Sequence, residues 1–170
     1  MTRIVDDNNG DVAQGEIGEI VYRGPTMMQG YWNKPEATAE AFEGGWFHSG
    51  DLVRQDAEGF VYVVDRKKDM IISGGENIYC AEVENVLFAH PKIREAAVIG
   101  RPDDKWGEVP VAVVALAADN LTLGDLEPFL NESLARYKHP KSLVVVTELP
   151  RNASGKVLKH VLRKELQGSQ

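Results

Sequence analysis

Two long apolar runs constrain the fold of this chain more than any other feature. Residues 96–99 read Ala-Ala-Val-Ile, and residues 109–117 contain no charged side chain. Strands with so few polar interruptions are typical of buried sheets, because a solvent-facing strand carries polar residues at alternate positions. We therefore predict that both runs form buried strands of a domain with its own hydrophobic core.

The elements around these strands alternate in type. The pattern predicts, in order, a strand at 70–72, a glycine turn at 74–75, a helix at 81–89, a helix at 123–134, a strand at 143–146 and a last helix at 157–166. Pro128 fits the second helix if Asp125 is its N-cap, because a proline in the first turn loses no intrahelical hydrogen bond. The predicted fold class is α+β, with helices packed on a short sheet.

The first 64 residues have a different character. They predict a strand at 18–23, a short helix at 35–42 and a hairpin with arms at 52–53 and 60–64. Residues 1–65 carry 4 Lys and Arg against 12 Asp and Glu, a charge of −8, whereas residues 66–170 carry 15 against 14. We predict a mostly β unit over 1–64, a linker at 65–68 and a second unit over 69–170.

Composition excludes several classes of function. A net charge of −7 argues against nonspecific nucleic-acid binding, which depends on neutralising phosphates. No apolar run approaches the roughly 20 residues that cross a bilayer, and the N-terminus lacks the apolar core of a signal peptide. With one cysteine and four scattered histidines, we expect no intrachain disulfide, no metal site and a cytoplasmic location. Peripheral contact with a membrane stays open.

A lysine on a short loop is the first candidate for chemistry. Residues 150–156 read Pro-Arg-Asn-Ala-Ser-Gly-Lys and are followed at once by an amphipathic helix. Lys156 has little to pack against on such a loop, so its ammonium is free to reach into a neighbouring site. Taken alone, the segment is a weak signal, because Ser-Gly-Lys is also a common surface turn.

Two segments near the unit boundary carry further polar candidates. Asp51 ends the segment Gly-Trp-Phe-His-Ser-Gly-Asp, where its carboxylate could accept hydrogen bonds from a vicinal diol such as ribose. The alternative for Asp51 is an Asx turn after a buried aromatic pair. The charged segment 65–69, Asp-Arg-Lys-Lys-Asp, is either a solvated turn or the linker between the units.

Two segments of the second unit could contact a cofactor. In 73–78, Ser-Gly-Gly-Glu-Asn-Ile, the paired glycines allow a backbone to approach a ligand closely, or simply turn a hairpin. In 137–141, Tyr-Lys-His-Pro-Lys, an aromatic ring lies among cations. The ring could stack on an adenine, and the cations could pair with phosphates. Tyr137 could instead be a half-buried residue that only packs against its neighbours. The same alternative holds for Trp106, which follows Asp-Asp-Lys at 103–105.

The order of these segments resembles the C-terminal part of an adenylate-forming (ANL superfamily) enzyme, most like a bacterial long-chain fatty acyl-CoA synthetase. The resemblance implies that Asp51 and Arg66 bind the ribose of ATP or AMP and that Lys68 is the pivot of an interdomain hinge. Lys156 is implied to be the catalytic lysine of the first half-reaction. The implied CoA-binding residues are Gly74, Gly75, Trp106, Tyr137 and Lys141.

The resemblance also implies a reaction. A fatty acid–CoA ligase uses ATP and Mg²⁺ to convert its acid into an acyl-adenylate, rotates its C-terminal domain, and lets coenzyme A attack to give acyl-CoA and AMP. The sequence Gly-Gly-Glu-Asn-Ile at 74–78 favours CoA as the acceptor, because carrier-protein adenylation domains usually carry a basic, arginine-containing sequence in this segment. The alternatives are an aryl-acid CoA ligase, a carrier-protein adenylation domain, and a non-catalytic nucleotide- or CoA-binding module.

The chain lacks the Ser/Thr/Gly-rich phosphate loop and the acyl pocket of that family. We therefore expect a fragment whose partner is the large N-terminal domain of the same enzyme, of which residues 1–64 are a mostly β remnant.

We predict that the purified 170-residue chain does not adenylate any carboxylic acid. Two ribose contacts supply only a few kcal/mol, at about 1.5–3 kcal/mol for each hydrogen bond to a charged group, and no loop is present to hold the triphosphate. The measurement is acid-dependent release of pyrophosphate from ATP. Release above a chain-free control would show that the fragment interpretation is wrong.

Overall fold

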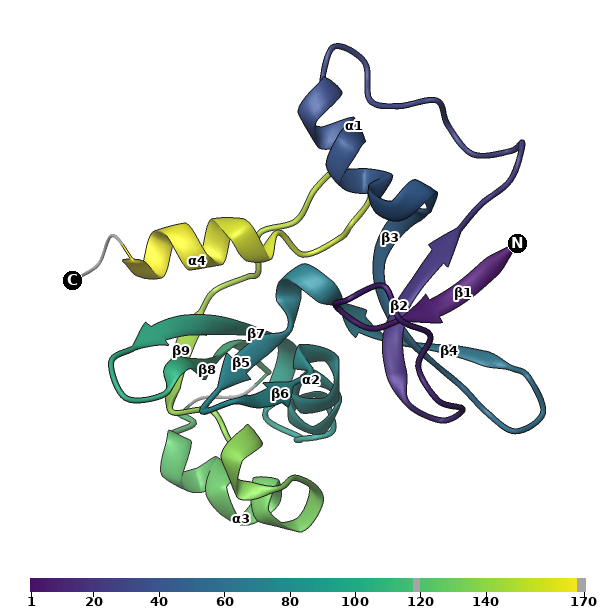
Figure 1. The fold of residues 1–170 in the computed structure, drawn as a ribbon. Coiled ribbons are helices and arrows are strands. Elements are labelled where there is room, and N and C mark those ends of the chain that lie inside the picture. Colours follow the sequence, from purple (N-terminus) through teal and green to yellow (C-terminus); the bar gives the residue numbers. More distant parts are fainter. Residues whose placement is uncertain (118–119, 168–170) are drawn as a thin grey trace. The chain divides into compact units, whose positions relative to one another are not determined.

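The computed structural model describes residues 1–117 and 120–167. The chain forms two compact units, Met1–Lys68 and Asp69–Gln170, each with a sheet of its own (Figure 1). Helices and strands alternate in the second unit and strands dominate the first, so the predicted α+β class is confirmed. None of the described helices is both long and apolar enough to cross a membrane.

The first unit is an antiparallel sheet with the strand order β1-β2-β3-β4. Its elements are β1 (Thr2–Val5), β2 (Ile17–Tyr22), α1 (Pro35–Ala41), the short 3₁₀ helix η1 (Glu43–Gly45), β3 (Phe47–Gln55) and β4 (Val61–Arg66). Val5, Val21 and Val53 are almost completely buried and form the centre of its small core. The predicted hairpin is the β3–β4 pair, and Gly59 adopts φ +91° in its turn.

The second unit is built on five strands in which β8 is central. Its elements are η2 (Lys67–Asp69, which starts in the first unit), β5 (Ile71–Ser73), β6 (Glu76–Ile78), α2 (Cys80–Phe88), β7 (Ile93–Asp103), β8 (Gly107–Leu116), α3 (Leu123–Ser133), η3 (Arg136–Lys138), β9 (Ser142–Val146) and α4 (Lys159–Gln167). Strand β8 pairs antiparallel with β7 and β5, and parallel with β9. The two apolar runs are therefore neighbours, as parts of β7 and β8.

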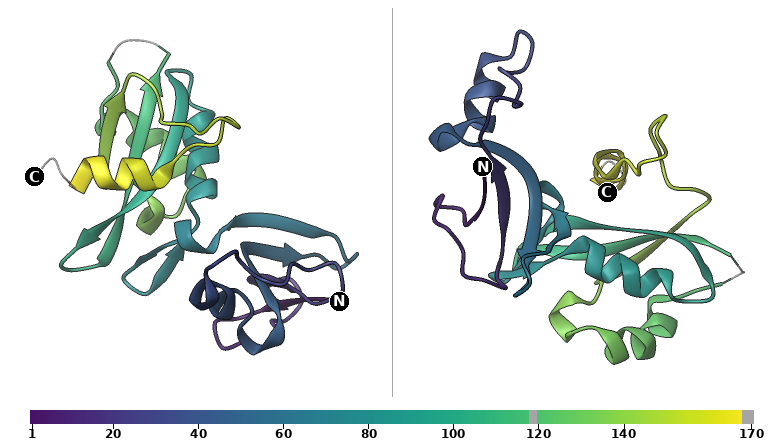
Figure 2. Two further views of the ribbon diagram at one scale, coloured as in Figure 1. Left: turned by 90° about the horizontal axis from the view of Figure 1, so that it is seen from above. Right: turned by 90° about the vertical axis from the view of Figure 1, so that its right-hand side faces the viewer.

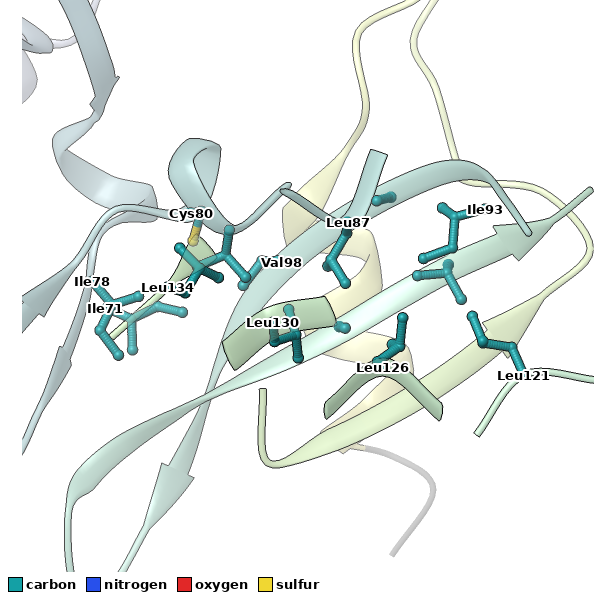
Figure 3. Close-up of a cluster of buried hydrophobic side chains, with 14 residues drawn as sticks. Ile71, Ile78, Cys80, Leu87, Ile93, Val98, Leu121, Leu126, Leu130 and Leu134 are labelled. Atoms are coloured by element: carbon teal, nitrogen blue, oxygen red, sulfur yellow. The ribbon is translucent and has the colours of Figure 1, made fainter. Parts of the chain in front are cut away.

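Side chains of β7 and β8 alternate between two buried faces. One face packs against α2 and α3, and its residues on these strands are Ile93, Ala96, Val98, Ala112 and Val114. Figure 3 labels Ile93 and Val98 in this cluster. The other face packs against α4, and its strand residues are Ala97, Ile99, Val111 and Val113. Both views of Figure 2 agree that α4 and α3 cover opposite faces of this sheet.

Helix α3 begins at Leu123, as predicted, but its N-cap is not the one that would accommodate Pro128. Thr122, and not Asp125, is the N-cap: the Thr122 hydroxyl accepts a hydrogen bond from the Asp125 amide, and the Asp125 carboxylate accepts one from the Thr122 amide. This capping box places Pro128 inside the helix, where the missing amide removes one hydrogen bond. Buried Leu126 and Leu130 hold the helix on the sheet in spite of that loss.

Candidate functional site

Asp51 and Arg66 form an ion pair across two neighbouring strands of the first unit. They are register partners on β3 and β4, and Arg66 Nε lies 2.9 Å from Asp51 Oδ1. Arg66 Nη1 also donates to the Ser49 carbonyl at 3.2 Å. Among the described residues, none forms a hydrogen bond or ion pair with the second carboxylate oxygen of Asp51. The two residues expected to bind ribose therefore lie together, and the second oxygen of Asp51 can accept a hydrogen bond from a hydroxyl group.

Glu19 on β2 is a residue of this site that the sequence analysis missed. Its side chain is only 5% exposed, and its carboxylate accepts hydrogen bonds from the Gly50 amide at 2.9 Å and from Lys67 Nζ at 3.1 Å. His48 Nδ1 lies 3.0 Å from the same carboxylate. The signal in the sequence is a carboxylate inside the otherwise apolar strand Ile-Gly-Glu-Ile-Val, a costly position unless the charge is partnered.

The partners of Glu19 determine its charge. Burial alone would raise the pKa of the Glu19 carboxyl, but hydrogen bonds from His48, Gly50 and Lys67 hold this pKa below its usual value. Burial would lower the pKa of the Lys67 ammonium, but Asp7, at 2.9 Å, and Glu19 raise that pKa above its usual value. Glu19 and Lys67 are therefore both charged at neutral pH.

An open cavity of about 700 Å³ lies beside this network. Its lining comes from β2, β3, α1, the end of β4 and the segment after it, and includes His48, Ser49, Gly50, Arg66, Lys67 and Lys68. Asp51 is not among the lining residues. Arg66 thus borders an accessible space in the first unit.

Lys68 stands at the end of the first unit, between two anchored neighbours. Lys67 is held by the carboxylates of its own unit, as described above. In the second unit, Arg163 Nη2 pairs with the Asp69 carboxylate at 2.8 Å, and Cys80 Sγ donates to the Asp69 carbonyl at 2.9 Å. The Lys68 side chain is exposed and makes no hydrogen bond or ion pair with any described residue.

Four of the five residues expected to bind CoA line one cavity in the second unit. The cavity has a volume of about 640 Å³, and Gly74, Trp106, Tyr137 and Lys141 are among its walls. The Gly74 amide donates to the Trp106 carbonyl at 2.8 Å, and a Cβ on Gly74 would lie 2.7 Å from the indole ring. Only glycine therefore fits there. Gly75, with φ +87°, completes the turn but is not part of the cavity wall.

Further polar residues that were not among the predicted CoA-binding residues line this cavity. Arg136 and His139 line it together with Glu76 and Glu127. Outside the wall, Lys138 Nζ lies 2.6 Å from both carboxylate oxygens of Glu82, which fixes η3 against α2. Burial would lower the pKa of Lys138, but the Glu82 carboxylate raises it above its usual value.

Lys156 lies on a loop that its own hydrogen bonds order. Asn152 Oδ1 accepts from the backbone amides of Ser154 at 3.1 Å and Lys156 at 2.9 Å, and the Gly155 amide donates to the Asn152 carbonyl at 2.9 Å. The Lys156 side chain is exposed, and its ammonium has no hydrogen-bond or ion-pair partner among the described residues. The loop is therefore ordered while the ammonium stays available.

Lys156 and the 640 Å³ cavity belong to opposite sides of the second sheet. The cavity wall includes Leu123, Gly124 and Leu130 of α3, which covers one face. The loop of Lys156 leads into α4, and Val157 packs with the cluster on the other face. The chain does not bring Lys156 together with the residues expected to bind CoA.

We predict that Glu19→Gln destabilises the first unit by about 1.5–3 kcal/mol, because hydrogen bonds to a buried charge are lost. Since the folded-state pKa of Glu19 lies below the ordinary value of 4.5, its stabilisation is present above that pH and is lost as the pH falls through the folded-state pKa. Amide exchange at Val21 and Val53, measured from pH 3 to 7, should show a smaller acid-induced loss of protection in Glu19→Gln than in the parent. The control is Glu58→Gln at an exposed turn; equal effects of the two variants would contradict the prediction.

Comparison with known proteins identifies relatives of this chain. Residues 82–156 match the family model of the AMP-binding enzyme C-terminal domain. A feruloyl-CoA synthase of Amycolatopsis sp is 52% identical over 163 residues, which cover 95% of this chain and 33% of that protein. The long-chain-fatty-acid–CoA ligase FadD13 of Mycobacterium tuberculosis is 44% identical over 158 residues, covering 93% of this chain and 31% of that ligase.

A solved structure agrees with these matches. The o-succinylbenzoate CoA synthetase (MenE) from Bacillus subtilis, in complex with the acyl-adenylate intermediate OSB-AMP, has a TM-score of 0.85 and 44% identity, and the match covers 100% of this chain and 34% of that one. The chain spans about a third of the length of these relatives. Residues 82–156 therefore carry an AMP-binding enzyme C-terminal domain, and the chain is similar to the C-terminal part of adenylate-forming acyl- and aryl-CoA ligases.

Proposed function

We propose that this chain acts as the C-terminal part of an acid–thiol ligase that joins a carboxylic acid to CoA through an acyl-adenylate. The observation that carries the proposal is the separation of two sites in the second unit. Lys156, whose ammonium has no partner among the described residues, lies on one side of the sheet, and a cavity bordered by Gly74 and Trp106 lies on the other. The full-length enzyme, in this proposal, is this chain preceded by the adenylation domain that the reaction requires.

ATP and Mg²⁺ are the proposed co-substrates of the first half-reaction. The MenE synthetase has also been solved in complex with ATP and magnesium ion. The described residues include no group of three or more His, Cys, Asp and Glu that could hold a metal. In this proposal Mg²⁺ therefore arrives with the nucleotide, because magnesium is commonly bound through substrate phosphates.

The role proposed for Asp51 and Arg66 is to bind the ribose. The second carboxylate oxygen of Asp51, which has no partner among the described residues, can accept a hydrogen bond from a hydroxyl of the 2′,3′-diol, and the ion pair with Arg66 orients the carboxylate. Arg66, which borders the cavity of the first unit, can donate to a ribose oxygen with an N–H that Asp51 does not use. Glu19 supports this arrangement by holding the Gly50 amide next to Asp51.

Lys156 is the proposed catalytic lysine of adenylation. In that step an acid oxygen forms a bond to the α-phosphorus and the bond to pyrophosphate breaks, so negative charge develops on the phosphoryl oxygens. An ammonium directed at those oxygens lowers the barrier electrostatically, without any proton transfer. The absence of a competing acidic partner among the described residues leaves the Lys156 charge available for this task.

The cavity of the second unit is the proposed CoA site for the second half-reaction. There the CoA sulfur attacks the carbonyl carbon of the adenylate, the bond to AMP breaks and the thiol proton goes to solvent. Trp106 and Tyr137 offer aromatic surfaces for stacking, while Arg136 and Lys141 can pair with phosphates. Gly74 lets the backbone of the β5–β6 turn approach the pantetheine arm.

The two half-reactions require the second unit to present opposite faces in turn. Lys68 is the proposed pivot, because both of its neighbours are anchored while its own side chain pairs with none of the described residues. A change in backbone torsion at a few residues is enough for a domain rotation. Lys156 would then serve adenylation, and the cavity would serve thioester formation.

The acid is either a fatty acid, as the sequence resemblance implies, or an aromatic acid. The aromatic class has the greater support from relatives, with 52% identity to the feruloyl-CoA synthase against 44% to the fatty-acid ligase. CoA-thioester formation by the full-length enzyme with ferulate and with palmitate distinguishes the classes. Failure with acids of both classes would contradict the proposed ligase function.

We predict that Lys156→Ala in the full-length enzyme lowers the rate of acyl-adenylate formation by roughly 10²–10³-fold, because a preorganised charge is removed from the transition state. Transfer of the acyl group from supplied acyl-adenylate to CoA should change little. The measurement is single-turnover kinetics of each half-reaction, with Lys164→Ala, an exposed lysine of α4, as the matched control. Equal losses in both half-reactions would mean that Lys156 has a structural role.

We predict that Lys68→Pro in the full-length enzyme separates the half-reactions. Proline fixes φ near −65° and restricts the residue before it, so the pivot cannot move between two backbone settings. Adenylation should survive better than thioester formation, which needs the rotated state. Lys68→Ala, which keeps backbone freedom, is the control. Rates of Lys68→Pro within about twofold of the parent in both steps, well under 1 kcal/mol, would show that the hinge assignment is wrong.

A further inference from the structure

A single arginine joins the Lys156 loop to the sheet beneath it. Arg151 Nη1 donates to the Gly155 carbonyl at 2.7 Å, directly before Lys156 in the chain. Arg151 Nη2 donates to Glu95 Oε2 at 3.0 Å. The planar guanidinium therefore connects the tip of the loop to Glu95 of β7. It can do so because its N–H groups point in different, fixed directions.

Glu95 is well placed to fix this arginine. It lies on β7, paired in register with Ala115 of the central strand, so its backbone belongs to the rigid part of the unit. Its side chain is 21% exposed, and a second cation, Arg94, lies 3.7 Å from its other oxygen. The hydrogen bond from Arg151 is the largest cause that lowers the pKa of the Glu95 carboxyl below its usual value.

The base of the loop is fixed by independent contacts. Leu149 is buried and Val157 packs beside it in the same apolar cluster. Arg151 and Val157 form an isolated antiparallel bridge, and the Leu158 amide donates to the Pro150 carbonyl at 2.8 Å. These contacts hold the two arms of the loop together, and the Arg151–Glu95 pair joins the loop to β7.

We propose that Glu95 is a positioning residue for adenylation: through Arg151 it sets where the Lys156 ammonium is presented to the reacting phosphate. The inference rests on the proposed function, in which Lys156 stabilises the adenylation transition state. Glu95 does not touch substrate in this proposal. It acts on the first half-reaction alone, because the CoA cavity is on the opposite face of the sheet.

The energetics favour an effect on position over an effect on stability. Ion pairs between partly exposed side chains contribute little to folding, and Arg151 and Glu95 are 42% and 21% exposed. Catalysis is more sensitive, because a displacement of about 1 Å can cost roughly 10²-fold in rate. Loss of one tether to an otherwise closed loop should therefore lower the adenylation rate by about tenfold.

The test uses Glu95→Gln in the full-length enzyme, with each half-reaction measured in single-turnover conditions. We expect an approximately tenfold lower rate of acyl-adenylate formation and an unchanged rate of acyl transfer from supplied acyl-adenylate to CoA. Arg151→Lys should behave alike, because one ammonium cannot reproduce both bonds of the guanidinium fork. Glu82→Gln is the matched control: it breaks the ion pair with Lys138 near η3, and it should leave adenylation unchanged.

A double-variant experiment separates positioning from general damage. In a Lys156→Ala background, Glu95→Gln should cause no further loss of adenylation, because the group that Glu95 positions is gone. A full additional tenfold loss in that background, or an equal loss in both half-reactions, would overturn the proposal. So would parent-like adenylation in the Glu95→Gln variant.

The outcome also distinguishes the inference from the proposed function. If the parent enzyme forms no acyl-adenylate, the proposed function fails. If the parent is active and Lys156→Ala is not impaired in adenylation, the role of Lys156 fails, and the inference with it. If both behave as expected and Glu95→Gln matches the parent, only the inference fails. Amide exchange at Gly155 and Lys156 gives a second readout, and it should be faster in Glu95→Gln and unchanged in Glu82→Gln.

Discussion

The burial of β7 and β8 on both faces is the constraint on which the second unit depends. Adjacent residues of these strands point to opposite sides, so each strand needs an apolar layer above and below it. Helices α2 and α3 supply one layer, and α4 supplies the other (Figure 1). The same alternation places the Lys156 loop before α4 and the cavity beside α3 on different faces of the sheet.

A small set of charged side chains fixes how the elements meet. Lys159 of α4 pairs with Glu84 of α2 at 2.7 Å, and the same Glu84 carboxylate accepts from the backbone amide of Val98 on β7. Arg163, one turn further along α4, pairs with Asp69. These contacts join α4 to α2 and to the residue that follows Lys68. A rotation about Lys68 would therefore carry the second unit, including the Lys156 loop, as one body.

Charged side chains also join the elements of the first unit. Its core is limited to three valines, one isoleucine and one leucine on one sheet, so the buried carboxylate of Glu19 has a large share in its organisation. Glu19 connects β2 to the Gly50 turn and to Lys67, and these connections lie on either side of the Asp51–Arg66 pair in the sequence. A buried charge with several donors specifies one geometry, because any other arrangement leaves the carboxylate without partners.

The sequence by itself determined the fold class, most of the elements and the candidate residues of the family resemblance. Apolar periodicity predicted α2, β7, β8 and α4 to within a few residues, because the burial of their apolar side chains determines which secondary structure these segments adopt. Glycines marked the β3–β4 and β5–β6 turns because those turns need positive φ. The suggested N-cap of α3, Asp125, was wrong, because Thr122 and Asp125 are both good capping residues and only the reciprocal hydrogen bonds decide between them.

The tertiary structure alone decided which polar residues meet. Glu19 and Lys67 are 48 residues apart, Glu82 and Lys138 are 56 apart, and Glu95 and Arg151 are 56 apart. No local pattern signals such pairs, because a charged residue looks the same in the sequence whether water or a distant partner satisfies it. The sequence could name Asp51, Trp106 and Lys156 as candidates. Their supporting partners follow only from how the strands pair and how the helices pack on them. The same packing places the Trp106 cavity and the Lys156 loop on opposite faces of the second sheet.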